Sequence, residues 1–116
     1  MTRNQLILVK KFEHDTNKYL KTIRAKNKNR LQTFIRGEKL SIGIQLLKKG
    51  EDYGEPHHHN DEVYFILKGH ANLHIGEKDF KVSPGMAFFV PRKIIHRFYN
   101  VRKELVFLFI FSGEDE

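Results

Sequence analysis

The chain of 116 residues contains no cysteine, no tryptophan and only three prolines. Without cysteine there is no disulfide, no thiolate ligand and no cysteine nucleophile, so any metal site must use nitrogen and oxygen ligands. Long apolar runs are also missing. The longest, residues 105–111, has the length of a strand and falls far below the roughly 18 residues of a membrane-spanning helix. The apolar run at residues 6–9 is shorter than the roughly 7–15 residues of a signal-peptide core. We therefore expect a cytoplasmic protein with no membrane partner.

Positive charge is abundant but unevenly distributed. The formal net charge is +7, and residues 1–50 hold 13 Lys and Arg against 3 Asp and Glu, whereas residues 51–116 hold 8 against 11. The surplus is densest in residues 18–30. Such a segment can attract phosphate or nucleic acid, but charge runs are more often solvated surface. Because the segment lacks the pattern of aromatic residues on which bases stack, we do not expect a nucleic-acid partner.

Short apolar segments separated by turns fill the chain after residue 30. A chain of this length fits one domain, and many short strands with such turns predict an all-β barrel or sandwich. The expected strands are 31–35, 40–47, 63–67, 71–75, 80–82, 86–90, 96–100 and 104–111.

The last predicted strand is apolar on both faces. Leu105, Phe107, Phe109 and Phe111 point one way, while the residues between them point the other way and are also apolar. A strand with one face in water would alternate with polar residues. We therefore expect the outer face to be covered, either by the N-terminal segment or by a second subunit, and favour a homodimer.

Residues 1–30 are predicted to form a basic extension that packs on the barrel, residues 31–113, or on a partner subunit. Residues 6–9 are expected to form a short strand. Asp15 and the two residues after it can cap a short helix that ends near Arg24. Tyr19, Leu20 and Ile23 have the spacing of one helical face.

Three consecutive histidines, His57, His58 and His59, precede Glu62 and the apolar run 63–67. A further histidine, His96, follows a second group of Gly and Pro residues. Neutral imidazoles and a carboxylate suit a divalent first-row metal ion. A glutamate at the start of an apolar strand is costly to bury alone, so a nearby cation would explain its position. These residues form the candidate site.

Residues 50–100 resemble the two sequence motifs of the cupin family. The residues that match the first motif are Gly50, His58, Glu62 and Gly69, and those that match the second are Gly85, Pro91, His96 and Asn100. The resemblance implies an antiparallel jelly-roll barrel of six to eight strands. It also implies a divalent metal ion (Fe, Mn, Ni, Cu or Zn) held by the histidines and glutamate of the first motif and the histidine of the second.

The same resemblance implies a function. A small metal-dependent cupin is expected to be an enzyme acting on a small organic molecule, with dioxygenase chemistry favoured over isomerase, cyclase or lyase chemistry. The alternative is a non-catalytic cupin that binds or senses a small ligand.

The chain departs from the motifs at two positions. Lys93 stands where the second motif has glycine, a loop position where we expect little effect. Pro56 stands where the first motif has its first ligand histidine, and proline cannot bind a metal. A neighbouring histidine must therefore replace that ligand, or the site must work with three.

The three consecutive histidines can supply the metal ligands of the first motif in two ways. In one extended strand, His58 would share a side with Glu62, and His57 and His59 would face the other side. A turn or bulge just before Glu62 would reset this alternation. We expect His58, Glu62 and His96 as ligands, with His57 or His59 completing the set. The pair His57 and His59, with Glu62 and His96, remains the alternative.

Side chains that share a face with these ligands are candidates for a pocket. Tyr64 and Ile66 share the side of Glu62, and Phe98 shares the side of His96. Gln45 and one of Phe88 or Phe89 are further candidates, although aromatic residues in such positions are usually core. An apolar pocket with few polar groups suits a small organic ligand. His70 and His74 are expected on a polar face and receive no role.

Overall fold

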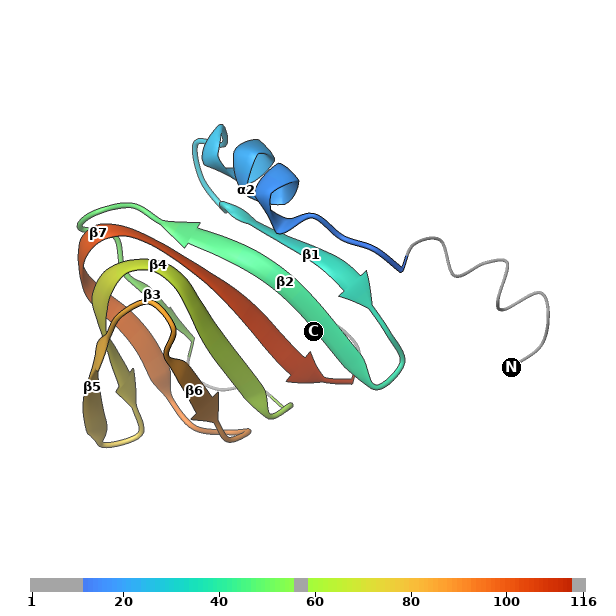
Figure 1. Ribbon diagram of the computed structural model, residues 1–116. Coiled ribbons are helices and arrows are strands. Elements are labelled where there is room, and N and C mark those ends of the chain that lie inside the picture. Colours follow the sequence, from blue (N-terminus) through green and yellow to red (C-terminus); the bar gives the residue numbers. More distant parts are fainter. Residues whose placement is uncertain (1–11, 56–58, 114–116) are drawn as a thin grey trace.

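Two long strands, β4 (Glu62–Ile75) and β7 (His96–Ser112), run antiparallel to each other and form the centre of the fold (Figure 1). The computed structural model describes residues 12–55 and 59–113. The remaining elements are α2 (Thr16–Arg24), β1 (Leu31–Arg36), β2 (Leu40–Leu47), β3 (Tyr53–Glu55), β5 (Lys78–Val82) and β6 (Ala87–Val90).

Each half of the two long strands has its own neighbours. The C-terminal half of β7 pairs with β2, which pairs with β1, and the N-terminal half of β7 pairs with β3. The first half of β4 pairs with β6 and its second half with β5. The predicted antiparallel jelly roll is therefore confirmed. Among the described residues, the strand path runs from β1 to β5 without closing, so the roll is open along one side.

At two places where the sequence predicts a gap between strands, the structure has a β-bulge inside one continuous strand. Residues 63–67 and 71–75 belong to one strand, β4, whose pairing with β7 shifts register between Ile66 and Asn72. Residues 96–100 and 104–111 likewise belong to β7, where Asn100 has a φ of 52°. A bulge keeps the strand paired while bending it, so the prediction of separate strands was wrong. The short strand β3 was not predicted.

The interior of the roll is apolar and rich in aromatic residues. Tyr64, Phe98 and Phe107 lie at its centre, with at most 1% of their surface exposed. The inward-facing residues of β7 belong to this cluster, whereas Val106 and Leu108 face outward. The prediction that the last strand is apolar on both faces is confirmed.

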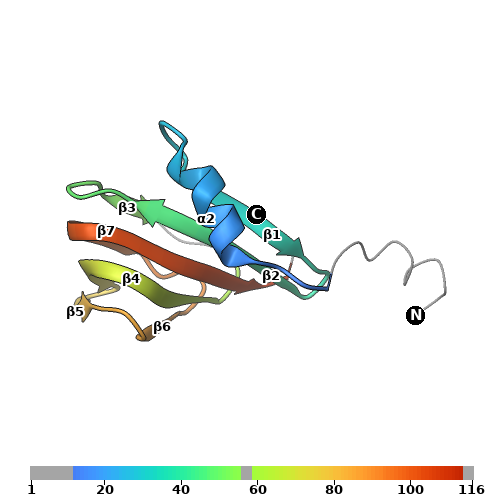
Figure 2. The ribbon, with the colours of Figure 1, turned by 45° about the horizontal axis from the view of Figure 1, so that its top comes forward.

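Helix α2 lies across the outer side of β1 and β2 (Figure 2). It begins as predicted, because the side chain of Asp15 accepts a hydrogen bond from the Asn17 N–H at 3.0 Å. Ile23 is fully buried against Ile44, Leu46 and Val106, so the helix covers the outward apolar residues of this part of the sheet. Within the described residues, no helix has the length and apolar character that crossing a membrane requires.

The bend in β4 depends on Gly69. Its φ of 96° is a conformation that other residues rarely adopt, and a Cβ there would lie 2.8 Å from the carbonyl carbon of Glu104 in β7. Both the backbone angle and the close approach of the two strands therefore require glycine.

We predict that Gly69→Ala lowers the free energy of unfolding by about 3 kcal/mol or more, because it combines left-handed strain with overpacking. Gly76→Ala is the matched control. Gly76 also has a positive φ, of 61°, but its nearest neighbour, the Cγ2 of Ile94, is 3.7 Å from the added Cβ. The control should lose only about 1–2 kcal/mol. Urea unfolding measures both, and equal losses would contradict the role given to the close approach.

Candidate functional site

Glu62 and His96 are the first residues of β4 and β7, and the curl of the roll brings them together. In the β4–β7 ladder, Glu62 pairs with Phe111 and His96 pairs with Ile75, at opposite ends. A flat ladder of this length would hold them about 40 Å apart. In the folded chain, Glu62 Oε1 and His96 Nε2 are 3.5 Å apart. Both residues are buried, with 6% and 2% of their surface exposed.

The imidazole of His96 is oriented by its other nitrogen. Nδ1 lies 2.9 Å from the carbonyl oxygen of Ile94. A carbonyl oxygen can only accept, so Nδ1 carries the proton and donates it. In the neutral imidazole, Nε2 then presents a lone pair toward Glu62 Oε1, which is also an acceptor when ionised. Two buried acceptors at this separation favour a positive charge between or beside them, either a proton or a metal ion.

The distance between these atoms fits two ligands of one metal ion. Nitrogen and oxygen ligands lie roughly 2.0–2.2 Å from zinc, so two of them at a tetrahedral angle are about 3.4 Å apart. Between residues 12–55 and 59–113, no group of three or more His, Cys, Asp or Glu side chains is placed to hold a metal ion. The described part of the chain thus provides two donors, and a complete site needs more.

The predicted histidine ligands are only partly placed. His57 and His58 lie outside the described residues. His59 is described, and its side chain is exposed in the bend that precedes β4. The choice between His58 and the pair His57 and His59 therefore stays a prediction.

Asp61 connects the loop before β4 with the loop before β7. Its Oδ1 accepts a hydrogen bond from the Arg92 N–H at 2.9 Å, and its carbonyl oxygen accepts one from the Ser112 N–H at 3.2 Å. The first contact holds the segment next to Glu62 against the segment that leads to His96. Sequence reasoning missed this residue, because its partner is 31 positions away and no local pattern indicates it.

Of the predicted pocket residues, Tyr64 lies beside His96, and Tyr64, Ile66 and Phe98 belong to one buried cluster. Tyr64, Ile66 and Phe98 are buried, and Gln45 is 5% exposed. The ring centroid of Tyr64 lies 4.9 Å from that of Phe98 and 6.0 Å from that of His96. The aromatic cluster therefore forms the inner wall next to the histidine.

Of the two remaining pocket candidates, Phe88 is 8% exposed and belongs to the interior cluster. Phe89 is 59% exposed on the outside of β6. The alternation of side chains along a strand allows only one of the two to face the interior.

The second half of the roll has a polar outer face. His74 Nδ1 and the Tyr99 hydroxyl each lie 2.8 Å from Asp79 Oδ1, and the guanidinium of Arg97 lies over the Tyr99 ring. The hydrogen bonds from Tyr99 and His74 hold the pKa of Asp79 below its ordinary value, and the same bond raises the pKa of Tyr99. His74 thus lies on a polar face, as expected, outside the candidate site.

Comparison with known proteins decides the family. The model of the Cupin domain family matches residues 43–111, which include β4, β7 and both residues of the candidate pair. The chain belongs to the cupin family. This cupin is 31% identical over 93 residues to an uncharacterised protein of Streptomyces coelicolor, covering 80% of the chain and 89% of that protein.

Solved structures support the fold. An RmlC-like cupin from Shewanella frigidimarina superposes with a TM-score of 0.68 at 20% identity, over 74% of this cupin and 77% of that chain. The DMSP lyase DddQ from Ruegeria pomeroyi superposes with a TM-score of 0.63 at 25% identity, over 69% of this cupin and 41% of the lyase. The fold thus occurs in an enzyme, whereas the relative from Streptomyces carries no stated activity.

We predict that Asp61→Ala loosens the loop before β7, because the Arg92 N–H loses its acceptor. Asp61→Asn retains an oxygen at the same position and should keep most of the bond. Hydrogen exchange of the Arg92 amide, followed by NMR, should be about tenfold faster in Asp61→Ala, as expected for a bond worth roughly 1–1.5 kcal/mol.

The carboxylate of Asp79 is exposed and has no bond to this loop, so Asp79→Ala is the control and should leave Arg92 exchange unchanged. Unchanged exchange in Asp61→Ala would show that this hydrogen bond does not hold the loop.

Proposed function

We propose that this cupin holds a divalent metal ion through Glu62 and His96, with the remaining donors from His57–His59, and binds a small organic molecule beside it. One observation carries the proposal: a buried carboxylate oxygen and a buried imidazole nitrogen face each other at 3.5 Å. Nitrogen and oxygen donors of this kind suit Fe, Mn, Ni, Cu and Zn. Membership of the cupin family, which the resemblance associates with such metals, supports the same assignment.

The residues around the pair have defined tasks in this proposal. A metal ion with an open coordination position would supply Lewis-acid catalysis or a site for O₂. The hydrogen bond from Nδ1 of His96 to Ile94 orients Nε2 toward Glu62, and metal-binding histidines are generally oriented by such a bond at the other ring nitrogen. Glu62 contributes negative charge, and Tyr64 closes the inner side of the site against water.

The packing beside His96 favours a small ligand. Inside the roll, the rings of Phe98 and Phe107 are 4.5 Å apart and those of Tyr64 and Phe107 are 5.2 Å apart. A molecule next to His96 would therefore contact this aromatic wall rather than pass through it. Among enzymatic reactions, dioxygenation stays our first expectation, and lyase chemistry is the next, since a DMSP lyase shares the fold.

A non-catalytic cupin that binds or senses a small ligand is the second candidate. Pro56 stands where the first cupin motif has a ligand histidine, and it favours this alternative because a site with fewer ligands would hold its metal more weakly.

Metal binding tests the proposal directly. After equilibrium dialysis against micromolar Fe²⁺, Mn²⁺, Ni²⁺, Cu²⁺ or Zn²⁺, metal analysis should find about one ion per chain for at least one metal. His96→Ala and Glu62→Gln should each raise the dissociation constant at least tenfold, since even outer-shell changes weaken metal sites by 10–100-fold. His74→Ala, which removes a histidine outside the site, should bind as the wild type does.

Circular dichroism should show that the variants remain folded. A wild type that binds none of these metals, or a His96→Ala variant with unchanged affinity, would refute the metal assignment. If the metal binds but O₂ uptake and product formation are absent across a panel of small organic acids and sugars, the non-catalytic alternative is favoured.

A further inference from the structure

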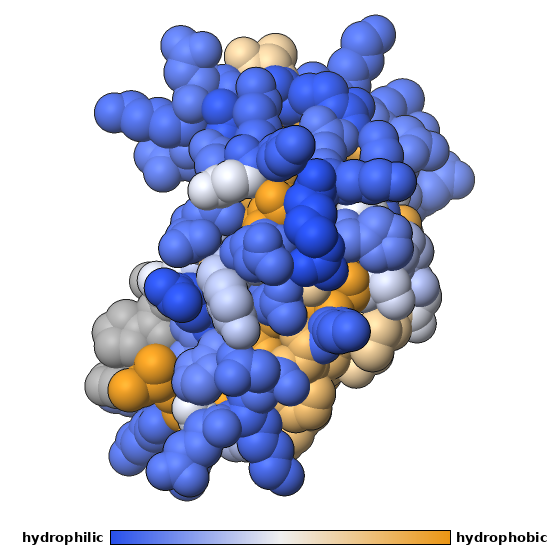
Figure 3. Space-filling view, turned by 90° about the vertical axis from the view of Figure 1, so that its left-hand side faces the viewer, coloured by the Kyte–Doolittle hydropathy of each residue, from blue (hydrophilic) through white to orange (hydrophobic). Residues whose placement is uncertain are grey.

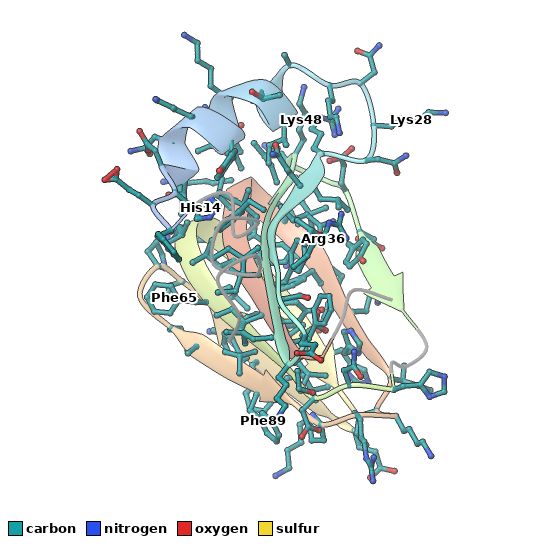
Figure 4. The ribbon with its side chains drawn as sticks, turned by 90° about the vertical axis from the view of Figure 1, so that its right-hand side faces the viewer. His14, Lys28, Arg36, Lys48, Phe65 and Phe89 are labelled. Carbon is teal, nitrogen blue, oxygen red and sulfur yellow. The ribbon has the colours of Figure 1, made fainter. Side chains whose placement is uncertain are left out.

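The loop between helix α2 and strand β1 is strongly basic. We call residues 25–30 the basic loop; it lies in the stretch 16–37, in which every charged residue is a Lys or an Arg. Lys28 of this loop and Lys48, which follows β2, lie at the same end of the molecule (Figure 4). On the face shown in Figure 3, hydrophilic side chains cover that end. A cluster of charges of one sign attracts ions of the opposite sign.

The basic loop is folded around the guanidinium of Arg30. Its Nε donates a hydrogen bond to the carbonyl oxygen of Lys26 and its Nη2 donates one to that of Asn27, both at 2.9 Å. Because the C=O and N–H of a trans peptide unit point in opposite directions, the N–H groups of Asn27 and Lys28 are turned away from the guanidinium. Within the described residues, neither N–H donates a hydrogen bond, and both residues are exposed. Two successive backbone donors therefore face solvent beside the lysines.

The backbone conformation of the loop suits an anion. Asn29, which follows these two donors, has a φ of 54° and thus a left-handed conformation. Successive backbone N–H groups in turns of this kind form concave anion-binding sites in proteins. The basic loop therefore directs donors, rather than carbonyl oxygens, toward an anion that approaches from solvent.

The neighbouring helix end is compensated. The carboxyl end of a helix carries partial negative charge, which would repel an anion. Two of the last carbonyl oxygens of α2 accept hydrogen bonds from the N–H groups of Ala25 and Lys26. Lys21 and Arg24 stand in the last turn, where a positive charge offsets the helix dipole.

An ion pair holds the turn after β2 against the basic loop. Arg30 Nη1 lies 3.0 Å and 3.1 Å from the two carboxylate oxygens of Glu51, and the Lys48 N–H donates to Glu51 Oε1 at 2.6 Å. This carboxylate is therefore occupied by Arg30 and by a backbone donor. Within the described residues, the ammonium groups of Lys28, Lys48 and Lys49 form no ion pair. Three uncompensated positive charges thus remain at this end.

We propose that the basic loop and the adjoining lysines form a binding site for an oligophosphate chain, either free or as part of a nucleotide. The N–H groups of Asn27 and Lys28 bind one phosphate, as backbone donors do in other phosphate sites. Lys28, Lys48 and Lys49 match the charge of the neighbouring phosphates, because lysine binds phosphate as a point charge. A nucleic acid fits less well, since the loop has no aromatic side chain on which a base could stack.

Two-dimensional ¹H–¹⁵N NMR of the full chain, titrated with sodium tripolyphosphate, tests the proposal. The amide protons of Asn27 and Lys28 should move downfield and saturate, because each gains a phosphate acceptor. The double variant Lys28→Gln/Lys48→Gln should raise the dissociation constant about tenfold, as expected for the loss of two exposed ion pairs. Lys39→Gln/Lys78→Gln is the matched control: it removes two exposed charges at other turns, and screening by salt should keep its affinity within about twofold of the wild type.

Further titrations identify the source of the phosphate. If a nucleoside triphosphate binds no more tightly than tripolyphosphate, the phosphate chain alone is recognised; if it binds more tightly, the nucleotide is the favoured source. Both results agree with the proposal. Circular dichroism checks the fold of each variant, and the single variant Lys28→Gln decides if the double variant does not fold.

Three results would overturn the proposal. The first is the absence of saturable shifts at Asn27 and Lys28 in millimolar tripolyphosphate. The second is an equal loss of affinity in the two double variants, which would show that only the net charge attracts the ligand. The third is a duplex DNA oligonucleotide that binds much more tightly than tripolyphosphate, which would assign this surface to a nucleic acid.

Discussion

The site depends on the curl of one antiparallel strand pair. β4 and β7 begin at opposite ends of their ladder, yet their first residues, Glu62 and His96, lie 3.5 Å apart. The bulges between Ile66 and Asn72 allow this by bending the ladder without breaking its pairing. Gly69 permits the bend because the backbone of β7 occupies the space that a side chain would need. The approach of Glu62 to His96 thus depends on backbone geometry in the middle of β4 and β7.

The buried, aromatic environment of Glu62 and His96 makes the net charge of this pair energetically important. Glu62 and His96 are buried next to aromatic rings, where electrostatic interactions are stronger than in water. A carboxylate facing the lone pair of an imidazole is unfavourable there unless a positive charge compensates it. The bond from His96 Nδ1 to Ile94 keeps the imidazole in the form that can accept such a charge. The same burial that makes the pair costly therefore makes it suitable as a metal-binding pair.

The sequence predicted the elements whose signals are local. The cap at Asp15, the positions of β1, β2, β5 and β6 and the two-faced pattern of 105–111 arise from side-chain periodicity and short-range hydrogen bonds. The prediction that Glu62 and His96 belong to one site required the cupin motifs, because nothing in their spacing shows that the strands curl.

Lys93 has a φ of 65°, so it adopts the backbone conformation that the motif's glycine would take, with a strain of roughly 1–2 kcal/mol.

Other features depend on tertiary contacts and were therefore missed. The predicted strands end two residues before Gly69 and at Asn100, since a glycine or an asparagine in the sequence indicates a turn and a bulge equally well. The contact of Asp61 with Arg92 joins two loops that only the fold brings together.

The protonation of His96 tests the central claim, that its Nε2 presents a lone pair to a cation shared with Glu62. Two-dimensional ¹H–¹⁵N NMR of the imidazole near neutral pH, without and with Zn²⁺, measures this directly. The account predicts that Nδ1 keeps its proton throughout and that the Nε2 resonance changes when Zn²⁺ binds, because the metal ion replaces any proton between Nε2 and Glu62. A proton on Nε2 that persists unchanged in saturating Zn²⁺ would contradict it.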